Sequence, residues 1–430
     1  MKSSRERGPF VELMKGNPGR NGCNTSMVVF LLGFVLSLKT VCSAGEISVR
    51  SDFSGGSAEI LTIDQKQRVI KMNPSAHSDR NRGWRCWWYC RIEGLIPGEV
   101  IQLDVGDAPW ATPDMATWSA DHIRWSHTEP GVREGKRIKY KIKAAAETIW
   151  VAWGPPFLLS DAERLVSELA KHPSADAFNL SDTREGRRTP ALSVSDAPKD
   201  GKRIGVWIQA RQHAWESGSS WVGKGFAEWL LSDDEMAVEL RKKSHVTFVP
   251  IMDVDNVERG AGGKNQKPQD HNRDWSEAPH WHSVRAAQKS ILVQKEEGRF
   301  DLFVDLHNPG AQNKDPYYYV PPEDLLKPIG KRNLASFVEA SKNEISGPLR
   351  FKGKTLASGS KYDAKAWFAI SKNWVSAHCA EHVVSVTLET PWNTPGSTTE
   401  GYLRVGHELG RAITRYLRDD VRSADASAPE

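Results

Sequence analysis

Between residues 157 and 420, apolar runs typical of buried strands alternate with longer segments whose apolar residues recur at helical spacing. The clearest strand-like runs are 203–210 and 300–307, and the clearest helical segments are 283–298 and 401–420. Such alternation is typical of an α/β fold, in which helices flank a central sheet. We therefore expect this stretch to form one α/β domain with a mixed, mostly parallel sheet.

The preceding stretch, residues 45–156, contains short runs rich in β-branched and aromatic residues, separated by Gly, Pro, Asp and Asn. This spacing predicts an antiparallel β-sandwich domain. Eight tryptophans crowd this stretch, and we expect them to fill its core or its contact with the next domain rather than to bind sugars or peptides. They are Trp84, Trp87, Trp88, Trp110, Trp118, Trp125, Trp150 and Trp153. Residues 421–430 are predicted to be a disordered tail.

The one strongly apolar run of the chain, residues 27–38, lies near the N-terminus. Its twelve residues are too few to span a bilayer but match the apolar part of a secretory signal. Basic residues precede it and small residues follow, so residues 1–44 are predicted to be a signal peptide cleaved after Ala44. The protein is then expected to be exported, to the periplasm or outside the cell, and not to stay in a membrane. A later start at Met14 or Met27, or a buried N-terminal helix, are the alternatives.

Net charge argues against a nucleic-acid partner. The formal net charge is +4, and residues 1–44 carry six basic and two acidic residues, also a net of +4, so the mature part is balanced. A nucleic-acid-binding surface normally carries excess positive charge. Three cysteines remain after Ala44, and Cys86 and Cys90 lie about 13 Å apart if they share a strand, too far to bridge. We expect buried thiols and no disulfide framework.

Polar residues follow three of the predicted strands at the end where α/β proteins collect functional groups. His213 and Glu216 follow one strand, His307 ends a second, and Glu389 ends a third. Two histidines and one carboxylate make up a catalytic zinc site, and a further carboxylate suits a general base. Taken singly, these residues are also compatible with hydrogen-bonded core histidines and with a carboxylate that caps a helix.

Several motifs in order resemble the zinc carboxypeptidases, particularly their cytosolic-carboxypeptidase branch. The segment "ARQHAWESGSSWVGKGFAEWLL" resembles the metal-binding segment of that family, "PIMDVDNVERGAGGKNQKPQDHNRDW" is similar to its substrate-binding segment, and "SVTLE" to its last catalytic strand. The likeness extends over residues 46–419 and includes the β-rich domain that precedes the catalytic domain in that branch.

The resemblance implies a zinc-dependent carboxypeptidase that removes the C-terminal residue of peptides or peptide-like substrates. His213, Glu216 and His307 match the ligands of Zn²⁺, and Glu389 matches the general base. Asn272 and Arg273 match the pair that binds the terminal carboxylate of the substrate, for which a guanidinium supplies two parallel hydrogen bonds.

One position departs from the family pattern in a way that bears on catalysis. Gly263 stands where the family has an arginine that stabilises the oxyanion, and we expect Lys264 or Arg259 to substitute for it. Two roles have no clear candidate: Trp367 and Tyr362 are the nearest to the family's substrate-binding tyrosine. The basic residue that sets side-chain preference is equally open, with Lys361, Lys365 and Lys372 more in keeping with solvated surface lysines.

Two alternatives follow from these observations. Loss of the arginine favours a catalytically impaired relative that binds C-terminal carboxylates through Asn272 and Arg273. The tryptophans of residues 45–156 would instead suit a sugar-binding module with the remainder as scaffold.

Overall fold

The computed structural model describes residues 45–74, 80–108, 112–198, 203–357 and 364–423. The expected signal peptide and most of the expected tail lie outside these residues. The described residues form one compact unit. Within the described ranges, no helix combines the length and the apolar character needed to cross a membrane.

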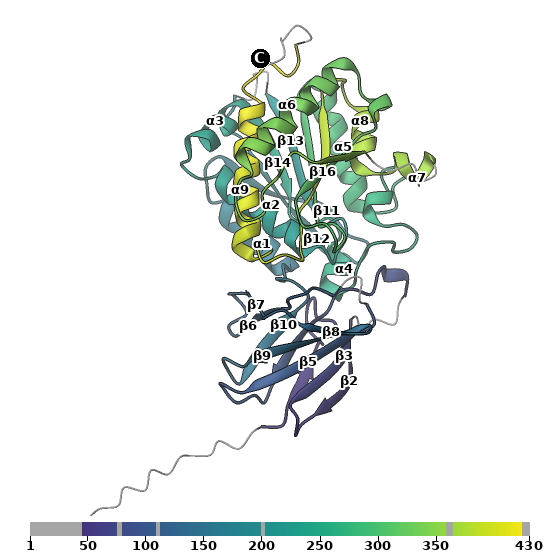
Figure 1. Cartoon of the computed structure of the whole chain (residues 1–430). Coiled ribbons are helices and arrows are strands. Elements are labelled where there is room, and N and C mark those ends of the chain that lie inside the picture. The colour runs from purple at the N-terminus through teal and green to yellow at the C-terminus, as the bar shows by residue number, and fades with distance from the viewer. Residues whose placement is uncertain (1–44, 75–79, 109–111, 199–202, 358–363, 424–430) are drawn as a thin grey trace, which may run out of the picture. The chain divides into compact units, whose positions relative to one another are not determined.

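Two five-stranded sheets make up the N-terminal part (Figure 1). One has the order β1 (Ser48–Arg50), β4 (Tyr89–Glu93), β10 (Thr148–Ala152), β6 (Thr117–Ser119) and β7 (Ser126–His127). The other has the order β2 (Glu59–Asp64), β3 (Val69–Asn73), β5 (Val100–Gly106), β9 (Arg137–Lys143) and β8 (Val132–Glu134).

Alternation of buried and exposed side chains turns one face of each sheet toward a shared core. In β9, for example, Ile138, Tyr140 and Ile142 are buried while the intervening side chains face outward. The pairings are antiparallel as predicted, except that β3 and β5 run parallel. The strand expected to hold both Cys86 and Cys90 begins only at Tyr89, because Cys86 lies in a turn; both thiols are buried and free, as expected.

The second part contains one mixed, eight-stranded sheet. Its order is β11 (Ala175–Asp182), β12 (Arg188–Val194), β14 (Ser244–Val249), β13 (Ile204–Ala210), β15 (Leu302–His307), β18 (Val384–Glu389), β16 (Tyr317–Val320) and β17 (Thr355–Ala357). The four central strands β14, β13, β15 and β18 are parallel, and antiparallel strands flank them on both sides. The predicted α/β fold is confirmed. Parallel central strands bring their carboxyl ends to one edge of the sheet, which is where the polar residues lie.

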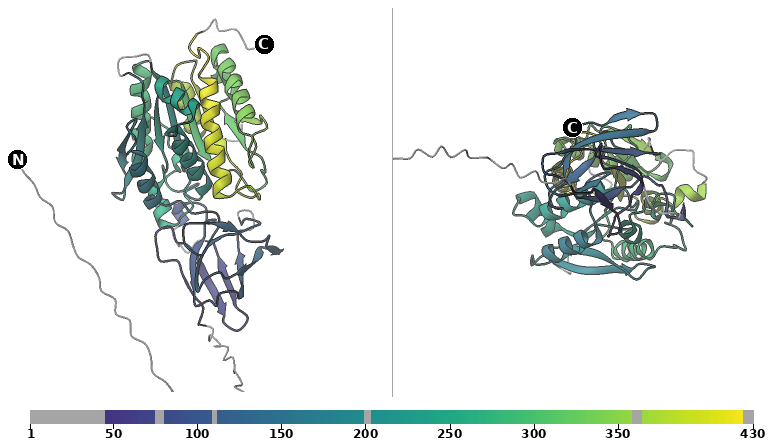
Figure 2. Two further views of the ribbon diagram at one scale, coloured as in Figure 1. Left: turned by 90° about the vertical axis from the view of Figure 1, so that its left-hand side faces the viewer. Right: turned by 90° about the horizontal axis from the view of Figure 1, so that it is seen from below.

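Helices cover both faces of this sheet (Figure 2). Alternate residues of β13 pack into different apolar clusters: Val206 and Ile208 belong to one cluster, whereas Trp207 belongs to the other. The first cluster includes side chains from α1 (Leu159–Leu169), α2 (Ser217–Leu230), α3 (Glu235–Lys243), α6 (Pro328–Glu344) and α9 (Thr399–Tyr416). The second includes side chains from α5 (His282–Glu296) and α8 (Ser371–His378). The short helices α4 (Val254–Arg259) and α7 (Ala364–Phe368) lie in connections.

Candidate metal centre

The loop that joins β13 to α2 carries the first two candidate ligands. Arg211 opens this loop with a φ of 65°, and its buried guanidinium donates hydrogen bonds to the carbonyl oxygens of Ala214 and Phe157. Burial lowers the pKa of Arg211 to about 9. The buried guanidinium thus fixes a tight bend, after which His213 and Glu216 point to the same side of the sheet edge.

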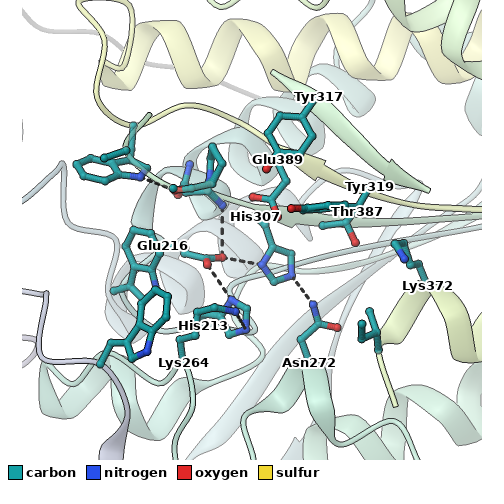
Figure 3. Close-up of a pocket in the computed structure, with 18 of the residues that line it drawn as sticks. His213, Glu216, Lys264, Asn272, His307, Tyr317, Tyr319, Lys372, Thr387 and Glu389 are labelled. Carbon is teal, nitrogen blue, oxygen red and sulfur yellow. Dashed lines mark hydrogen bonds and ion pairs between the residues drawn. The ribbon is translucent and has the colours of Figure 1, made fainter. Parts of the chain in front are cut away.

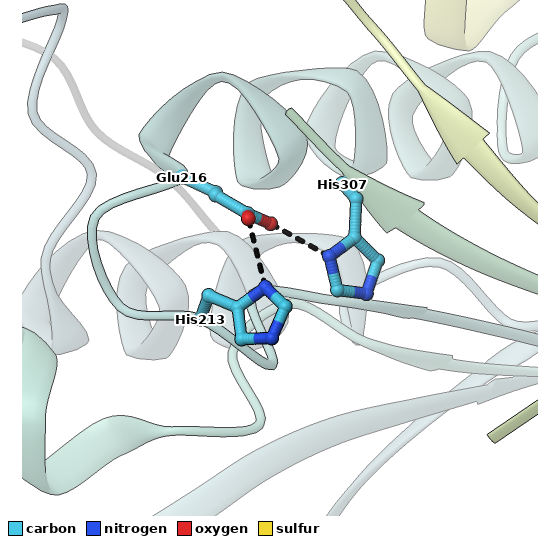
Figure 4. A group of neighbouring side chains, drawn as sticks. All are labelled: His213, Glu216 and His307. Atoms are coloured by element: carbon cyan, nitrogen blue, oxygen red, sulfur yellow. Dashed lines mark hydrogen bonds and ion pairs between the residues drawn. The ribbon is translucent and has the colours of Figure 1, made fainter. Parts of the chain in front are cut away.

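His213, Glu216 and His307 meet at the carboxyl ends of β13 and β15 (Figure 4). Glu216 Oε1 lies 2.8 Å from His213 Nδ1, Glu216 Oε2 lies 2.7 Å from His307 Nδ1, and the three potential ligand atoms lie within 4.8 Å of one another. All three side chains are buried. Burial opposes ionisation of Glu216, but the two imidazoles outweigh it and hold the pKa of the carboxyl well below its usual range.

An aspartate lies behind each imidazole, and Asp305 is hydrogen-bonded to His307. Asp305 Oδ2 lies 2.9 Å from His307 Nε2, and Asp270 Oδ1 lies 3.5 Å from His213 Nε2. A carboxylate on the far nitrogen fixes the ring and raises its basicity, an arrangement common behind histidines that bind metals. Two imidazole nitrogens turned toward one carboxylate in a buried site match the donor set of a catalytic zinc site. Sequence reasoning missed these aspartates, whose signal was the acidic residue two positions before His307 and two before Asn272.

Glu389 enters the same pocket from β18, where it pairs in register with His307 (Figure 3). The side chain is 8% exposed, and its Oε2 has no hydrogen-bond partner among the described residues. Burial raises the pKa of Glu389 to about 8, although His307 partly opposes the shift. The carboxyl of Glu389 thus lies in the pocket of the donor cluster with one oxygen that no described residue bonds.

Asn272 and Arg273 lie on the short 3₁₀ turn His271–Arg273 and line the pocket as expected. Asn272 Nδ2 is 3.4 Å from His307 Nε2, and its Oδ1 accepts a hydrogen bond from the backbone nitrogen of Ser371. Arg273 Nη1 donates to the carbonyl oxygen of Asn272. These contacts set an amide and a guanidinium beside the cluster.

Lys372 is not the solvated surface lysine that the sequence suggested. Lys372 is the second residue of α8. Its side chain is 1% exposed and lines the pocket. Burial, reinforced by the charge of Arg273, lowers the pKa of Lys372 to about 7. Lys361 and the side chain of Lys365 lie outside the described residues.

The structure separates the two candidates for the missing arginine. Lys264 lines the pocket, with its Nζ 3.4 Å from His213 Nε2. Arg259 ends α4, does not line the pocket, and its Nη2 lies 2.8 Å from a carboxylate oxygen of Glu185. That ion pair holds Arg259 away from the candidate metal ligands, so only Lys264 is brought to them.

Two tyrosines of the pocket escaped sequence reasoning. Tyr317 and Tyr319 lie on β16 beside β18, with Tyr317 in register with Glu389, and both line the pocket. Burial and the nearby Glu389 raise the pKa of Tyr317. Trp367 does not line the pocket, and Tyr362 lies outside the described residues. The run of three tyrosines ten residues after His307 was the signal.

A parallel sheet edge that holds a buried His–Glu–His cluster defines a class of metal-dependent hydrolases. Residues 163–394 match the zinc carboxypeptidase family, and the chain belongs to that family. Similar curated proteins include an uncharacterised protein of Zymomonas mobilis, 24% identical over 54% of this chain and 60% of its own length. Human cytosolic carboxypeptidase 1 is 23% identical over 56% of this chain and 23% of its own length. The chain thus spans less than two thirds of either relative.

Solved structures agree in fold over most of the chain. A metallo-carboxypeptidase from Burkholderia cenocepacia has a TM-score of 0.75 at 22% identity, covering 86% of this chain and 99% of that chain. One from Pseudomonas aeruginosa has a TM-score of 0.73 at 20% identity, covering 87% of this chain and 100% of that chain. The shared fold thus includes the N-terminal β-rich part as well as the sheet that carries the site.

Proposed function

We propose that the protein is a zinc-dependent carboxypeptidase that hydrolyses the last peptide bond of peptides or peptide-like substrates. The observation that carries the proposal is the grouping of three functions in one pocket. A buried His–Glu–His cluster shares the pocket with Glu389, whose Oε2 has no hydrogen-bond partner among the described residues, and with the cationic Asn272–Arg273 pair.

His213, Glu216 and His307 would hold the metal, which, when bound, lowers the pKa of water and polarises a carbonyl group. Glu389 accepts the proton of the attacking water and passes it to the departing amine. A bound cation would lower the pKa of Glu389, which burial raises to about 8, and would thereby favour the carboxylate form that accepts the proton at neutral pH.

Arg273 and Asn272 set the register of the substrate. The guanidinium and the amide bind the terminal carboxylate, so that the last peptide bond lies beside the metal ligands and Glu389. An internal peptide bond has no free carboxylate to offer this pair, which explains why only the terminal residue would be removed.

The alternative is a relative that binds C-terminal carboxylates without turnover, and Gly263 at the position of the family arginine favours it. Against it stands Glu389, since binding alone requires no proton acceptor. We also propose export of the protein, on the strength of the apolar run 27–38. Detection of the mature N-terminus after Ala44 in secreted material tests that.

The deciding experiment combines metal analysis with hydrolysis of a library of peptides that differ in their C-terminal residue, with and without a chelator. We expect about one zinc ion per chain and release that the chelator abolishes. Glu389→Gln should keep the metal and lower turnover by about 100-fold or more. Zinc without chelator-sensitive release supports the binding alternative, and an active Glu389→Gln variant contradicts the mechanism.

A further inference from the structure

A loop of the N-terminal β-rich part reaches the pocket. Its residues 81–84 lie along the glycine-rich loop 260–267, which carries Lys264. Three backbone hydrogen bonds join the two loops: Gly263 N to Arg82 O at 2.9 Å, Trp84 N to Lys264 O at 2.9 Å, and Lys267 N to Asn81 O at 2.7 Å. Backbone pairing of this kind fixes the two loops relative to each other.

Glycines permit this close approach. A Cβ at Gly262 would lie 1.9 Å from the carbonyl oxygen of Trp84, and a Cβ at Gly83 would lie 2.5 Å from that of Lys264. At Gly263, where φ is 76°, a Cβ would lie 2.5 Å from Asp253 Oδ2. The position of the family arginine is therefore one where only glycine fits, and the loop pairs with residues 81–84 instead.

Because the two loops are paired, the side chain of Trp84 lies at the wall of the pocket. Trp84 is partly buried, lines the pocket, and has the ammonium group of Lys264 5.6 Å from its ring centroid. Trp215 and Trp392 line the same pocket, with ring centroids 6.0 Å apart. Trp392 is held by a hydrogen bond from its Nε1 to the carbonyl oxygen of Pro309. The three indoles are called the tryptophan wall below.

The orientation of a substrate follows from the labelled residues of Figure 3. Lys264 lies on one side of His213 and His307, and Asn272 and Lys372 lie on the other. The terminal carboxylate of a substrate would bind at Asn272, and its scissile bond would lie at the two histidines. The residue that precedes the scissile bond would then lie on the Lys264 side. That side is where Trp84 lies.

We propose that the tryptophan wall, with Trp84 supplied by the N-terminal part, is a subsite for an aromatic side chain at the penultimate position of the substrate. The inference rests on the proposed function, because that function defines which bond is cut. Flat indole faces favour rings through offset or edge-to-face contacts. An acidic penultimate side chain would meet three indoles and only one cation, Lys264.

The test uses N-acylated dipeptides that share the best C-terminal residue from the library and carry Phe, Ala or Glu at the penultimate position. The full chain is compared with Trp84→Ala, Trp84→Phe and, as a matched control, Trp118→Ala, which removes a partly buried indole of the β-rich part that does not line the pocket. We expect kcat/KM for Phe to exceed that for Ala and Glu by about 10-fold. Trp84→Ala should abolish this preference, Trp84→Phe should retain most of it, and Trp118→Ala should leave it unchanged.

Calorimetric affinities of the same peptides for Glu389→Gln, with and without Trp84→Ala, give a second readout that needs no turnover. An unchanged Phe preference in Trp84→Ala, equal losses for all three peptides, or a wild-type preference for Glu or Ala would overturn the subsite. Absence of hydrolysis contradicts only the proposed function, since the ranking of affinities still decides whether the tryptophan wall binds aromatic side chains.

Discussion

Lys264 is the residue that we expect to replace the arginine implied by the family resemblance at Gly263. It directly follows Gly263, and among the described residues of this loop it is the cation that the structure brings to the pocket. Its Nζ is 3.4 Å from the outer nitrogen of His213, and Trp84 lies against it. A flexible ammonium in this place is able to approach a developing oxyanion.

We predict that Lys264→Ala lowers kcat by about 100- to 1,000-fold, as expected when an oxyanion donor is lost. Arg259→Ala is the control, because Arg259 pairs with Glu185 outside the pocket and should leave kcat unchanged. Steady-state kinetics with metal content measured in parallel decide the matter. Wild-type kcat in Lys264→Ala would remove the residue from the mechanism.

Lys372 predicts a pH dependence of substrate preference. With a pKa of about 7, its ammonium is charged below pH 7 and loses its proton as the pH rises above it. Preference for a C-terminal Glu over Gln should therefore be largest near pH 6 and fall by up to about 10-fold by pH 8. Lys372→Met should remove this dependence, as measured by the ratio of kcat/KM for the two peptides. A ratio that rises with pH would contradict the assignment.

At the scale of elements, the central strands and their flanking helices followed from the sequence. Short, mainly apolar runs locate β13, β15 and β18, and the helical spacing of apolar residues locates α5 and α9. The structure of the loops was harder to predict from the sequence. The close pairing of residues 81–84 with residues 260–267 depends on backbone contacts between segments far apart in the chain, which composition does not reveal.

The glycine-rich loop 260–267 allows a prediction about the free energy of unfolding. Gly263→Ala introduces a Cβ that would lie 2.5 Å from Asp253 Oδ2 and 2.7 Å from Ala214 N, at a φ of 76°. Gly186→Ala has a similar φ of 79° but meets no atom within 4 Å, so it isolates the backbone strain, which is about 1–2 kcal/mol. Gly263→Ala should lower the free energy of unfolding by about 1–3 kcal/mol more than Gly186→Ala does, as measured by urea denaturation. Equal losses would mean that the loop relaxes.

At the scale of the whole molecule, a cluster of tryptophans joins the β-rich part to the α/β part. The Trp153 ring centroid lies 5.2 Å from that of Trp215 and 4.4 Å from that of Trp392. Nearby, Asn393 Oδ1 accepts a hydrogen bond from the backbone nitrogen of Asp114. The expectation that indoles fill the contact between the β-rich part and the α/β part is confirmed for Trp153. Trp84 instead lines the pocket.

Trp153→Ala should therefore weaken both parts together. Removal of a buried tryptophan typically lowers the free energy of unfolding by about 3–5 kcal/mol, and Trp153 is 2% exposed. Denaturant unfolding followed by both far-UV circular dichroism and tryptophan fluorescence should stay coincident for the wild type, in keeping with one compact unit. Two separate transitions in the wild type would show that the parts unfold independently.

The sequence by itself predicted the zinc carboxypeptidase family and the α/β fold, and both predictions are confirmed, because several motifs in order and apolar runs after one another leave a signature in the sequence. The sequence also proposed His213, Glu216, His307 and Glu389 as site residues, and the structure brings all four side chains to one pocket.

Only the tertiary structure decided what surrounds them. It turned Lys372 inward, held Arg259 on Glu185, and brought Trp84 beside Lys264 across a gap of 180 residues. The physical reason is that a charge or an indole in a loop has no preferred neighbour in the sequence. Its partner is chosen by packing between distant segments.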